Sequence, residues 1–384
     1  MADRGRHLIV AGVTTRPVAV SASRAGWKVT AADAFGDLDL RACAEVLLPS
    51  APAAGFDPHA AALAAREIPA GYAAYTSNLE NYPDAVAALA RGRRLLGNPP
   101  AILRRVRDPL ALMRSLRRLG FATPPTRATP PRRPLDPGLR WLLKPRRSGG
   151  GHGTSAWRPG RRVTRHHYLQ ERIAGRPGSV IFLADGRRAH VLGISRQLVG
   201  RAEFGVRGFR YCGSLMGPGL FPAEETLRRR AEALAGAVAS TFGLVGLAGL
   251  DFIARAGVPW PIEVNPRYSA SMELLERGAG LSLFALHADA CAGRLPERPT
   301  PALERVFGKA IVFARRAVTP QATDGWLLDA GLADVPHAGV PITRGRPICT
   351  VFASREHAQN CVGSLVSRAG WVYRQLEPAA RGVA

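Results

Sequence analysis

The chain has 384 residues, of which 46% are hydrophobic, so it can form two or three packed domains and does not resemble a disordered chain. Its formal net charge is +24, but the basic residues are spread along the whole chain. There is no aromatic-interleaved patch or helix-turn-helix pattern, which argues against nucleic-acid binding. No apolar run approaches the roughly 20 residues of a membrane helix, and the first apolar run is too short for a signal peptide. We therefore expect a cytoplasmic protein without nucleic-acid or membrane partners.

The cysteines indicate the redox environment of the chain, and the few lysines indicate candidate site positions. The five cysteines are scattered and form no C-x-x-C pair, which is typical of reduced thiols in a cytoplasm. Only three of the 53 basic residues are lysines, namely Lys28, Lys144 and Lys309. Because Arg replaces Lys almost everywhere, a retained Lys indicates a site that needs a compact ammonium group rather than a planar fork.

The first hundred residues alternate between strand and helix patterns. His7–Val13 and Lys28–Ala32 are predicted strands on either side of a helix at Thr14–Gly26, and Gly71–Tyr75 is a further predicted strand. This βαβ order indicates a parallel sheet. Ligands bind such sheets at the strand ends. The candidate substrate contacts there are Thr14, Arg16, Ser77, Asn78 and Glu80.

A glycine-rich loop follows in the middle of the chain. A helix is predicted at Asp108–Leu119, then an exposed Pro- and Arg-rich connection at Thr123–Pro137, then a strand that ends at Lys144. Glycines let backbone N–H groups close around phosphate oxygens, and a nearby Lys adds a positive charge. We favour a phosphate-binding loop over a ligand-free hairpin, and we interpret His152 as a loop residue. The loop carries Ser148, Gly149, Gly150, Gly151 and Gly153.

The next predicted strands are His167–Ile173, Ser179–Leu183 and Ala189–Ser195, and Ala223–Phe242 is a predicted amphipathic helix. Between them, the Gly- and Arg-rich stretch 207–219 is predicted to be a loop near a substrate, with Arg207 and Tyr211 as candidate contacts.

The C-terminal part is predicted to contain strands at Phe307–Ala314, 338–342 and Pro347–Phe352, and His357–Gln375 is predicted to be a closing helix or a helix plus a strand. Lys309 either points into an active site or lies on a surface strand.

The most informative stretch is a predicted hairpin. The apolar runs Gly249–Ala254 and Trp260–Val264 are joined by a turn, and each carries one acid, Asp251 and Glu263. Asn265 lies two residues beyond Glu263 and so points to the same face, and a hairpin can bring Asp251 opposite them. Two carboxylates and an amide oxygen suit Mg²⁺, or Mn²⁺. The alternative, a solvated hairpin, is disfavoured because an unpaired charge in an apolar run is costly.

The motif D-F-I…P-I-E-V-N-P-R resembles the metal-binding end of the ATP-grasp superfamily. The resemblance implies an α/β (α+β) ATP-grasp fold in which the metal on the ATP phosphates is held by Asp251, Glu263 and Asn265. It also implies that Arg267 faces an acyl-phosphate intermediate. Three domains are implied: an N-terminal α/β domain at 1–104, a two-lobed ATP-grasp domain at 105–304 and a small β-rich C-terminal domain at 305–384.

The strand–Lys–Pro–Gly-loop segment is similar to the family's flap over the β- and γ-phosphates, which implies that Lys144 and the loop bind ATP. The strand end with Gln170, Glu171 and Ile173 then lies beside adenine. Two departures stand out. The family's Lys at the helix start is absent from Arg107-Asp108-Pro109, so either Arg107 substitutes or the contact is lost. No acid near Pro177 is available for the ribose.

The resemblance implies an ATP-dependent ligase that activates a small-molecule carboxylate as an acyl phosphate for attack by an amine, releasing ADP and phosphate. Some features look similar to carbamoyl-phosphate-synthase-like ligases and to the glutamate ligases of methanofuran- or methanopterin-type cofactor synthesis. A homodimer is compatible with this class. The alternatives are a biotin-carboxylase-like enzyme that forms carboxyphosphate, and a non-catalytic nucleotide- or nucleic-acid-binding scaffold.

Overall fold

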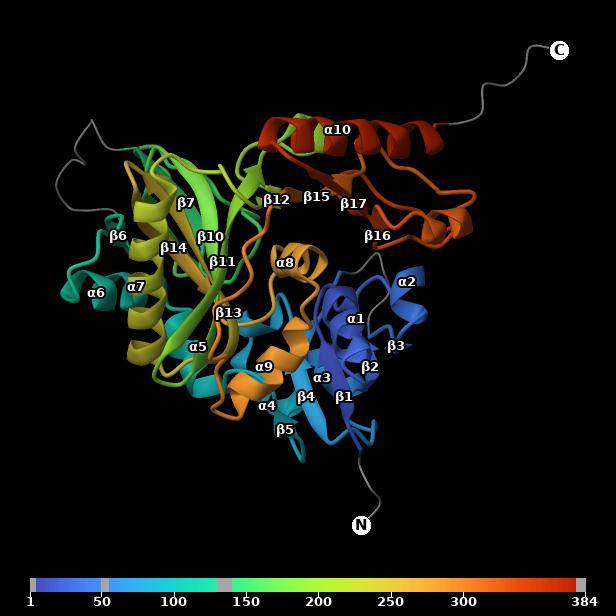
Figure 1. Cartoon of the computed structure of the whole chain (residues 1–384), viewed down its shortest axis with the longest axis horizontal. Helices are drawn as coiled ribbons and strands as arrows, with labels where there is room; N and C mark the ends of the chain where they lie inside the picture. The colour runs from blue at the N-terminus through green and yellow to red at the C-terminus, as the bar shows by residue number, and fades with distance from the viewer. Residues whose placement is uncertain (1–4, 50–54, 130–139, 378–384) are drawn as a thin grey trace.

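The computed structural model describes residues 5–49, 55–129 and 140–377, and these form three sheets (Figure 1). The N-terminal sheet has five parallel strands in the order β3-β2-β1-β4-β5. The chain alternates between strand and helix here, and the apolar run of β1 is buried, as expected for a parallel sheet covered on both faces. Its elements are β1 (His7–Ala11), α1 (Arg16–Arg24), β2 (Lys28–Ala32), α2 (Leu38–Arg41), β3 (Glu45–Leu47), α3 (Pro58–Ala64), β4 (Tyr72–Tyr75), η2 (Leu79–Asn81), α4 (Pro83–Leu89) and β5 (Arg94–Leu95).

The central sheet has eight antiparallel strands in the order β14-β13-β10-β11-β12-β15-β17-β16. Helix α7 (Glu224–Phe242) covers one face, and its stripe of Leu227, Ala231, Leu234, Val238 and Phe242 is buried. The strands are β10 (Arg176–Asp185), β11 (Ala189–Val199), β12 (Tyr211–Met216), β13 (Val245–Arg255), β14 (Val258–Asn265), β15 (Val306–Phe313), β16 (Leu332–Ala333) and β17 (Pro347–Arg355).

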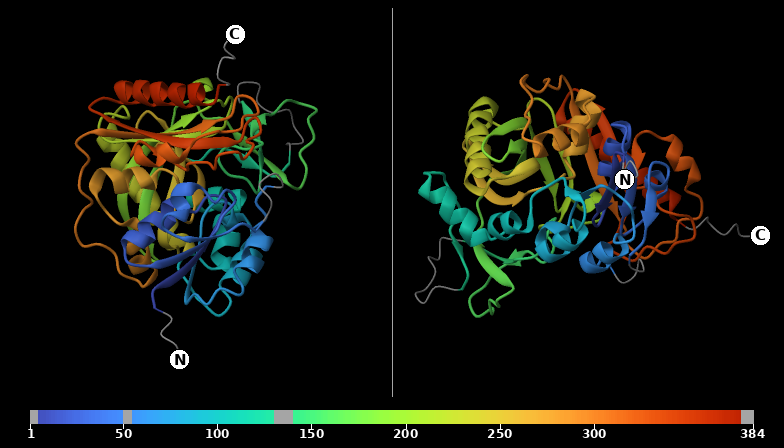
Figure 2. Two further views of the ribbon diagram at one scale, coloured as in Figure 1. Left: turned by 90° about the vertical axis from the view of Figure 1, so that its right-hand side faces the viewer. Right: turned by 90° about the horizontal axis from the view of Figure 1, so that it is seen from below.

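A small four-stranded sheet, in the order β6-β9-β7-β8, lies at the side of the central sheet (Figures 1 and 2). It consists of β6 (Thr126–Arg127), β7 (Trp141–Pro145), β8 (Ser155–Ala156) and β9 (His167–Glu171). The remaining helices are α5 (Pro100–Val106), α6 (Pro109–Arg118), η3 (Ala202–Phe204), α7 (Glu224–Phe242), α8 (Met272–Ala279), α9 (Leu283–Cys291), η4 (Asp324–Leu328) and α10 (Ala358–Gln375). Among the described helices, none has an apolar stretch long enough to cross a bilayer.

The mixed α/β fold class predicted from the sequence is confirmed, but two local predictions are wrong. Half of the predicted loop 207–219 is strand β12, because its Y-C-G-S-L-M run is buried. Residues 338–342 form only an isolated bridge at Ile342, since Gly339 has a φ of +76° and Pro341 has no N–H for a strand ladder. Of the two alternatives left open for the closing segment, the structure has the helix alone, α10 (Ala358–Gln375).

The C-terminal strands do not form a sheet of their own. Strands β15, β17 and β16 continue the central sheet beyond β12, and α10 packs on β15 and β17. About half of the predicted connection 123–137 lies outside the described residues. The domain boundaries at 104 and 304 stay a prediction.

A buried ion-pair network joins the N-terminal sheet to the C-terminal half of the chain. The guanidinium of Arg16 on α1 lies 2.8 Å from Glu273 on α8 and 2.6 Å from Asp334. The ammonium of Lys309 on β15 lies 2.7 Å from the same Glu273. Arg16 is 2% exposed and Glu273 is 5% exposed. Arg16, expected at the substrate, is therefore engaged between the N-terminal sheet and the C-terminal half of the chain.

We predict that Arg16→Met lowers the free energy of unfolding by about 3 kcal/mol, because the buried Glu273 loses one of its cationic partners and Asp334 loses its ion pair. The matched control is Arg104→Met. Arg104 pairs with Asp84 at 2.6 Å, but the two side chains are 57% and 79% exposed, so we expect a loss below about 1 kcal/mol. Urea unfolding followed by tryptophan fluorescence measures both. Equal losses would contradict a structural role for Arg16.

Candidate active site

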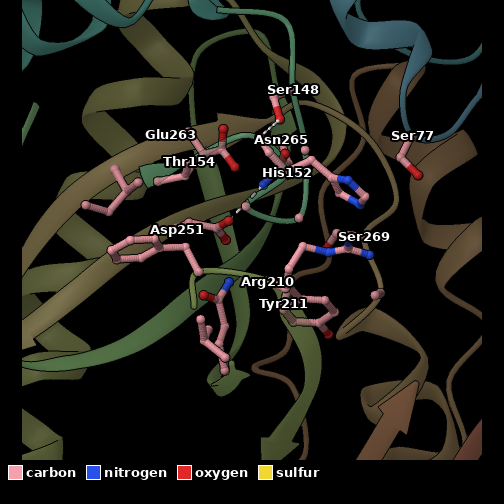
Figure 3. Close-up of a pocket in the computed structure, with 18 of the residues that line it drawn as sticks. Ser77, Ser148, His152, Thr154, Arg210, Tyr211, Asp251, Glu263, Asn265 and Ser269 are labelled. Carbon is pink, nitrogen blue, oxygen red and sulfur yellow. Dashed lines mark hydrogen bonds between the residues drawn. The ribbon is translucent and has the colours of Figure 1, made fainter. Parts of the chain in front are cut away.

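A cavity of about 1530 Å³ is lined by the four-stranded and eight-stranded sheets and by the loops that follow β1 and β4 (Figure 3). Those two loops lie at the carboxyl ends of parallel strands, where ligands of such sheets bind. Of the substrate residues predicted from this region, Thr14, Ser77 and Asn78 line the cavity.

The predicted hairpin at one end of the cavity is confirmed. Strands β13 and β14 are antiparallel neighbours, with Asp251 directly opposite Glu263 and with Gly249 opposite Asn265. The amide Nδ2 of Asn265 donates to Oδ2 of Asp251 at 3.2 Å. The hairpin thus brings the three predicted metal ligands together at one point of the cavity wall.

Burial, and then the charge of Glu263, raise the pKa of Asp251 to about 6, although hydrogen bonds with Ser179 and Gln197 lower it. Two facing carboxylates therefore repel each other in a site of restricted hydration. A divalent cation between them would remove that repulsion, and the oxygen donors match what Mg²⁺ or Mn²⁺ prefers. The described residues contain no cluster of three or more His, Cys, Asp or Glu suited to a metal. A metal here would thus use two carboxylates, the amide oxygen of Asn265 and outside ligands.

Two arginines border this acidic pair. Arg267 is 9% exposed, lines the cavity and lies 2.8 Å from Glu80. Glu80 is buried behind Arg267 and does not line the cavity, so its predicted direct contact with substrate is not supported. Arg107 donates to the backbone oxygen of Val264 at 2.7 Å and lies 3.4 Å from Oε2 of Glu263. Arg107, at the helix start where the family's Lys is missing, thus lies beside Glu263, one of the predicted metal ligands.

The glycine-rich loop closes over the same cavity. Gly149, Gly150 and Gly151 line it, whereas Gly153 packs on Pro145 outside the lining. Ser148 also lines the cavity, and its hydroxyl donates to the backbone oxygen of His152 at 2.7 Å.

The loop is held against the segment that leads into β12. The N–H of Tyr211 donates to the oxygen of Gly150 at 3.0 Å. Gly151 has a φ of +74°, and a Cβ there would lie 1.8 Å from the oxygen of Phe209. Only glycine permits this approach.

The predicted ATP-binding residues on the small sheet also meet the cavity. Nζ of Lys144 on β7 donates to Oε1 of Gln170 on β9 at 3.0 Å. Glu171 and Ile173 line the cavity beyond Gln170.

Tyr211 also lines the cavity, and its hydroxyl lies 2.9 Å from Oγ of Ser214. Arg207 is exposed and outside the lining, whereas its neighbour Arg210 lines the cavity. Sequence reasoning missed Arg210. It left Lys309 open between a site and a surface position, and the structure buries Lys309 at the cavity wall.

Comparison with known proteins identifies the class. Residues 106–271 match the family model described as an ATP-grasp domain. This match agrees with the resemblance of the hairpin motif to the ATP-grasp superfamily.

Two curated relatives share part of the sequence. An uncharacterized protein of Methanocaldococcus jannaschii is 27% identical over 131 residues, which are 34% of this chain and 31% of the relative. The carbamoyl phosphate synthase large chain of Thermoplasma acidophilum is 28% identical over 134 residues, which are 35% of this chain and 12% of that protein. The chain therefore matches less than a third of either relative's length.

Solved structures extend the likeness to nearly the whole chain. The L-amino acid ligase from Bacillus licheniformis has a TM-score of 0.67 at 17% identity and covers 96% of this chain and 97% of that chain. The N5-carboxyaminoimidazole ribonucleotide synthetase from Thermus thermophilus has a TM-score of 0.67 at 19% identity, with 98% and 99% covered. The biotin carboxylase from Campylobacter jejuni has a TM-score of 0.70 at 14% identity, with 94% and 89% covered. At these identities the likeness shows a shared fold.

We predict that Gly151→Ala detaches the glycine-rich loop, because its Cβ collides with the Phe209 backbone and its φ is left-handed. The amide of Tyr211 then exchanges with solvent at least tenfold faster, measured by hydrogen exchange. Gly149→Ala is the matched control, since a Cβ at Gly149 meets nothing within 4 Å. An unchanged Tyr211 amide in Gly151→Ala would contradict the contact.

Proposed function

We propose that this chain is an ATP-dependent ligase that activates a small-molecule carboxylate as an acyl phosphate and joins it to an amine. One observation carries the proposal: the facing carboxylates of Asp251 and Glu263 share a cavity with the glycine-rich loop and Lys144, within an ATP-grasp domain.

The chemistry has two steps. A carboxylate oxygen attacks the γ-phosphorus of ATP, the bond from that phosphorus to the β–γ bridging oxygen breaks, and ADP leaves. The amine nitrogen then attacks the acyl carbon, phosphate leaves, and the nitrogen loses a proton. Because phosphoryl transfer is catalysed mainly by positioning and by neutralising charge, the protein needs no covalent nucleophile.

Each group of residues has a role in this proposal. The loop amides at Gly149, Gly150 and Gly151 and the ammonium of Lys144 hold the phosphates. A divalent cation held by Asp251, Glu263 and Asn265 supplies charge neutralisation at the phosphates. The guanidinium of Arg267, oriented by its ion pair with Glu80, contacts the anionic acyl phosphate. Adenine lies beside Gln170, Glu171 and Ile173.

The finer assignments stay proposals. They include Mg²⁺ as the metal, the cytoplasm as the location, a homodimer as the assembly, and a role in making a methanofuran- or methanopterin-type cofactor. The last of these makes glutamate the first amine to test.

We predict that Mg·ATP yields ADP in a substrate-dependent way across a panel of carboxylate and amine pairs that includes glutamate and bicarbonate. Glu263→Gln and Asn265→Ala lower the rate at least a hundredfold while the fold persists, since each removes a metal ligand. Glu225→Gln, exposed in the first turn of α7, keeps the wild-type rate. Coupled ADP detection measures all four proteins. Full turnover in both site variants, or release of AMP in place of ADP, would contradict the proposal.

We also predict that Lys144→Arg lowers the rate at least tenfold although the charge is kept. The compact ammonium of Lys144 contacts Gln170 at 3.0 Å, and the larger planar guanidinium cannot occupy the same position. Lys28→Arg is the matched control because Lys28 is exposed at the start of β2. Equal rates for both variants would contradict the inference that the lysine retained at position 144 marks a site that needs a compact ammonium group.

A further inference from the structure

Several cationic side chains that line the cavity form no ion pair with a carboxylate, and Arg210 is the one of them, among the described residues, whose Nε is buried without a hydrogen-bond partner. Arg267 pairs with Glu80 at 2.8 Å, Lys309 with Glu273 at 2.7 Å, and Arg107 lies 3.4 Å from Glu263. Arg210 also lines the cavity, but within the described ranges it forms no salt bridge.

The backbone around Arg210 fixes where its side chain lies. The oxygen of Arg210 accepts from the N–H of Gly200 at 2.7 Å, and the next residue begins β12. The guanidinium lies over the ring of Phe313, 5.2 Å from its centroid. Burial lowers the pKa of Arg210, and no carboxylate raises it. A half-buried guanidinium without an anion is costly, so this arrangement favours an anionic ligand.

His152 adds a second polar group from the glycine-rich loop. The loop is held beside Arg210 by the hydrogen bond between the Tyr211 amide and Gly150 and by the close approach of Gly151 to Phe209. Partial burial, and then the positive charges of Arg210 and Arg346, lower the pKa of His152. A neutral imidazole can donate one hydrogen bond to an anion without adding to the repulsion.

The position of this pair separates it from the proposed phosphoryl-transfer centre. In Figure 3 the side chains of His152 and Arg210 point into the part of the cavity near Ser269, and Asp251 and Glu263 lie to the other side. An anionic group held at Arg210 is therefore distinct from the carboxylate that receives the phosphoryl group.

We infer that Arg210 and His152 form a subsite for a second anionic group, a carboxylate or a phosphate, on a substrate of this cavity. The assignment to a ligase substrate rests on the proposed function; the anion site itself rests on Arg210. The subsite makes the enzyme selective for substrates with two acidic groups over those with one.

The test uses the full chain saturated with Mg·ADP, so that nucleotide phosphates do not compete. Calorimetric titrations use three probes: glutarate, a dicarboxylate; pentanoate, a monocarboxylate of equal length; and inorganic phosphate. We expect glutarate or phosphate to bind the wild type, and Arg210→Gln to weaken that binding about tenfold or more, as for loss of a charge-assisted hydrogen bond. The preferred probe tells whether the natural group is a carboxylate or a phosphate.

Two variants keep the test interpretable. Arg207→Gln, in the same segment but exposed and outside the cavity, binds the probes as the wild type does. Arg210→Lys keeps the charge and retains part of the affinity. Urea unfolding verifies that each variant is folded. Pentanoate binding is the same in all four proteins.

Three results would overturn the inference: no binding of glutarate or phosphate to the wild type, equal binding to wild type and Arg210→Gln, or an Arg210→Gln loss confined to Mg·ATP affinity. The last result would assign Arg210 to the nucleotide phosphates. Arg210-dependent anion binding without ADP release under any substrate would contradict the proposed ligase function and leave the anion subsite standing.

Discussion

The repulsion between two carboxylates that face each other across β13 and β14 is the constraint on which the site depends. Asp251 and Glu263 are held in register by the strand pairing, and Asp251 is fixed further by its neighbours on β10 and β11. Such a pair stays doubly ionised near neutral pH where cations approach it, and otherwise one of the two carboxyl groups tends to bind a proton. Arg107 and Arg267 approach it from the protein, and the open side faces the cavity.

The N-terminal sheet serves the same centre although it contributes no predicted metal ligand. Its short helix η2 after β4 carries Glu80, which orients Arg267, and Asn81, which accepts from Arg107 at 2.9 Å. Arg16 ties α1 to Glu273 and hence to Lys309 at the cavity wall. The two arginines beside the acidic pair are thus positioned by a domain that lies outside the ATP-grasp match at 106–271.

Local sequence patterns predicted those parts of the site that are formed by residues close together in the sequence. A period of two placed Glu263 and Asn265 on one face, and the glycine run marked a loop that only glycine can form at Gly151. The prediction that Arg16 contacts substrate failed because its carboxylate partners lie 257 and 318 residues away in the sequence. The prediction for Arg207 failed because Arg210, three residues further along the same segment, is the arginine that lines the cavity. No local pattern contains either fact.

The most direct measurement of the central claim, that the facing carboxylates hold a divalent metal on nucleotide phosphates, is a Mn²⁺ titration in the presence of ADP, followed by electron paramagnetic resonance. The account predicts one Mn²⁺ site per chain that needs ADP and is lost in Asp251→Asn and Glu263→Gln. ADP-dependent Mn²⁺ binding that is unchanged in both variants would contradict it.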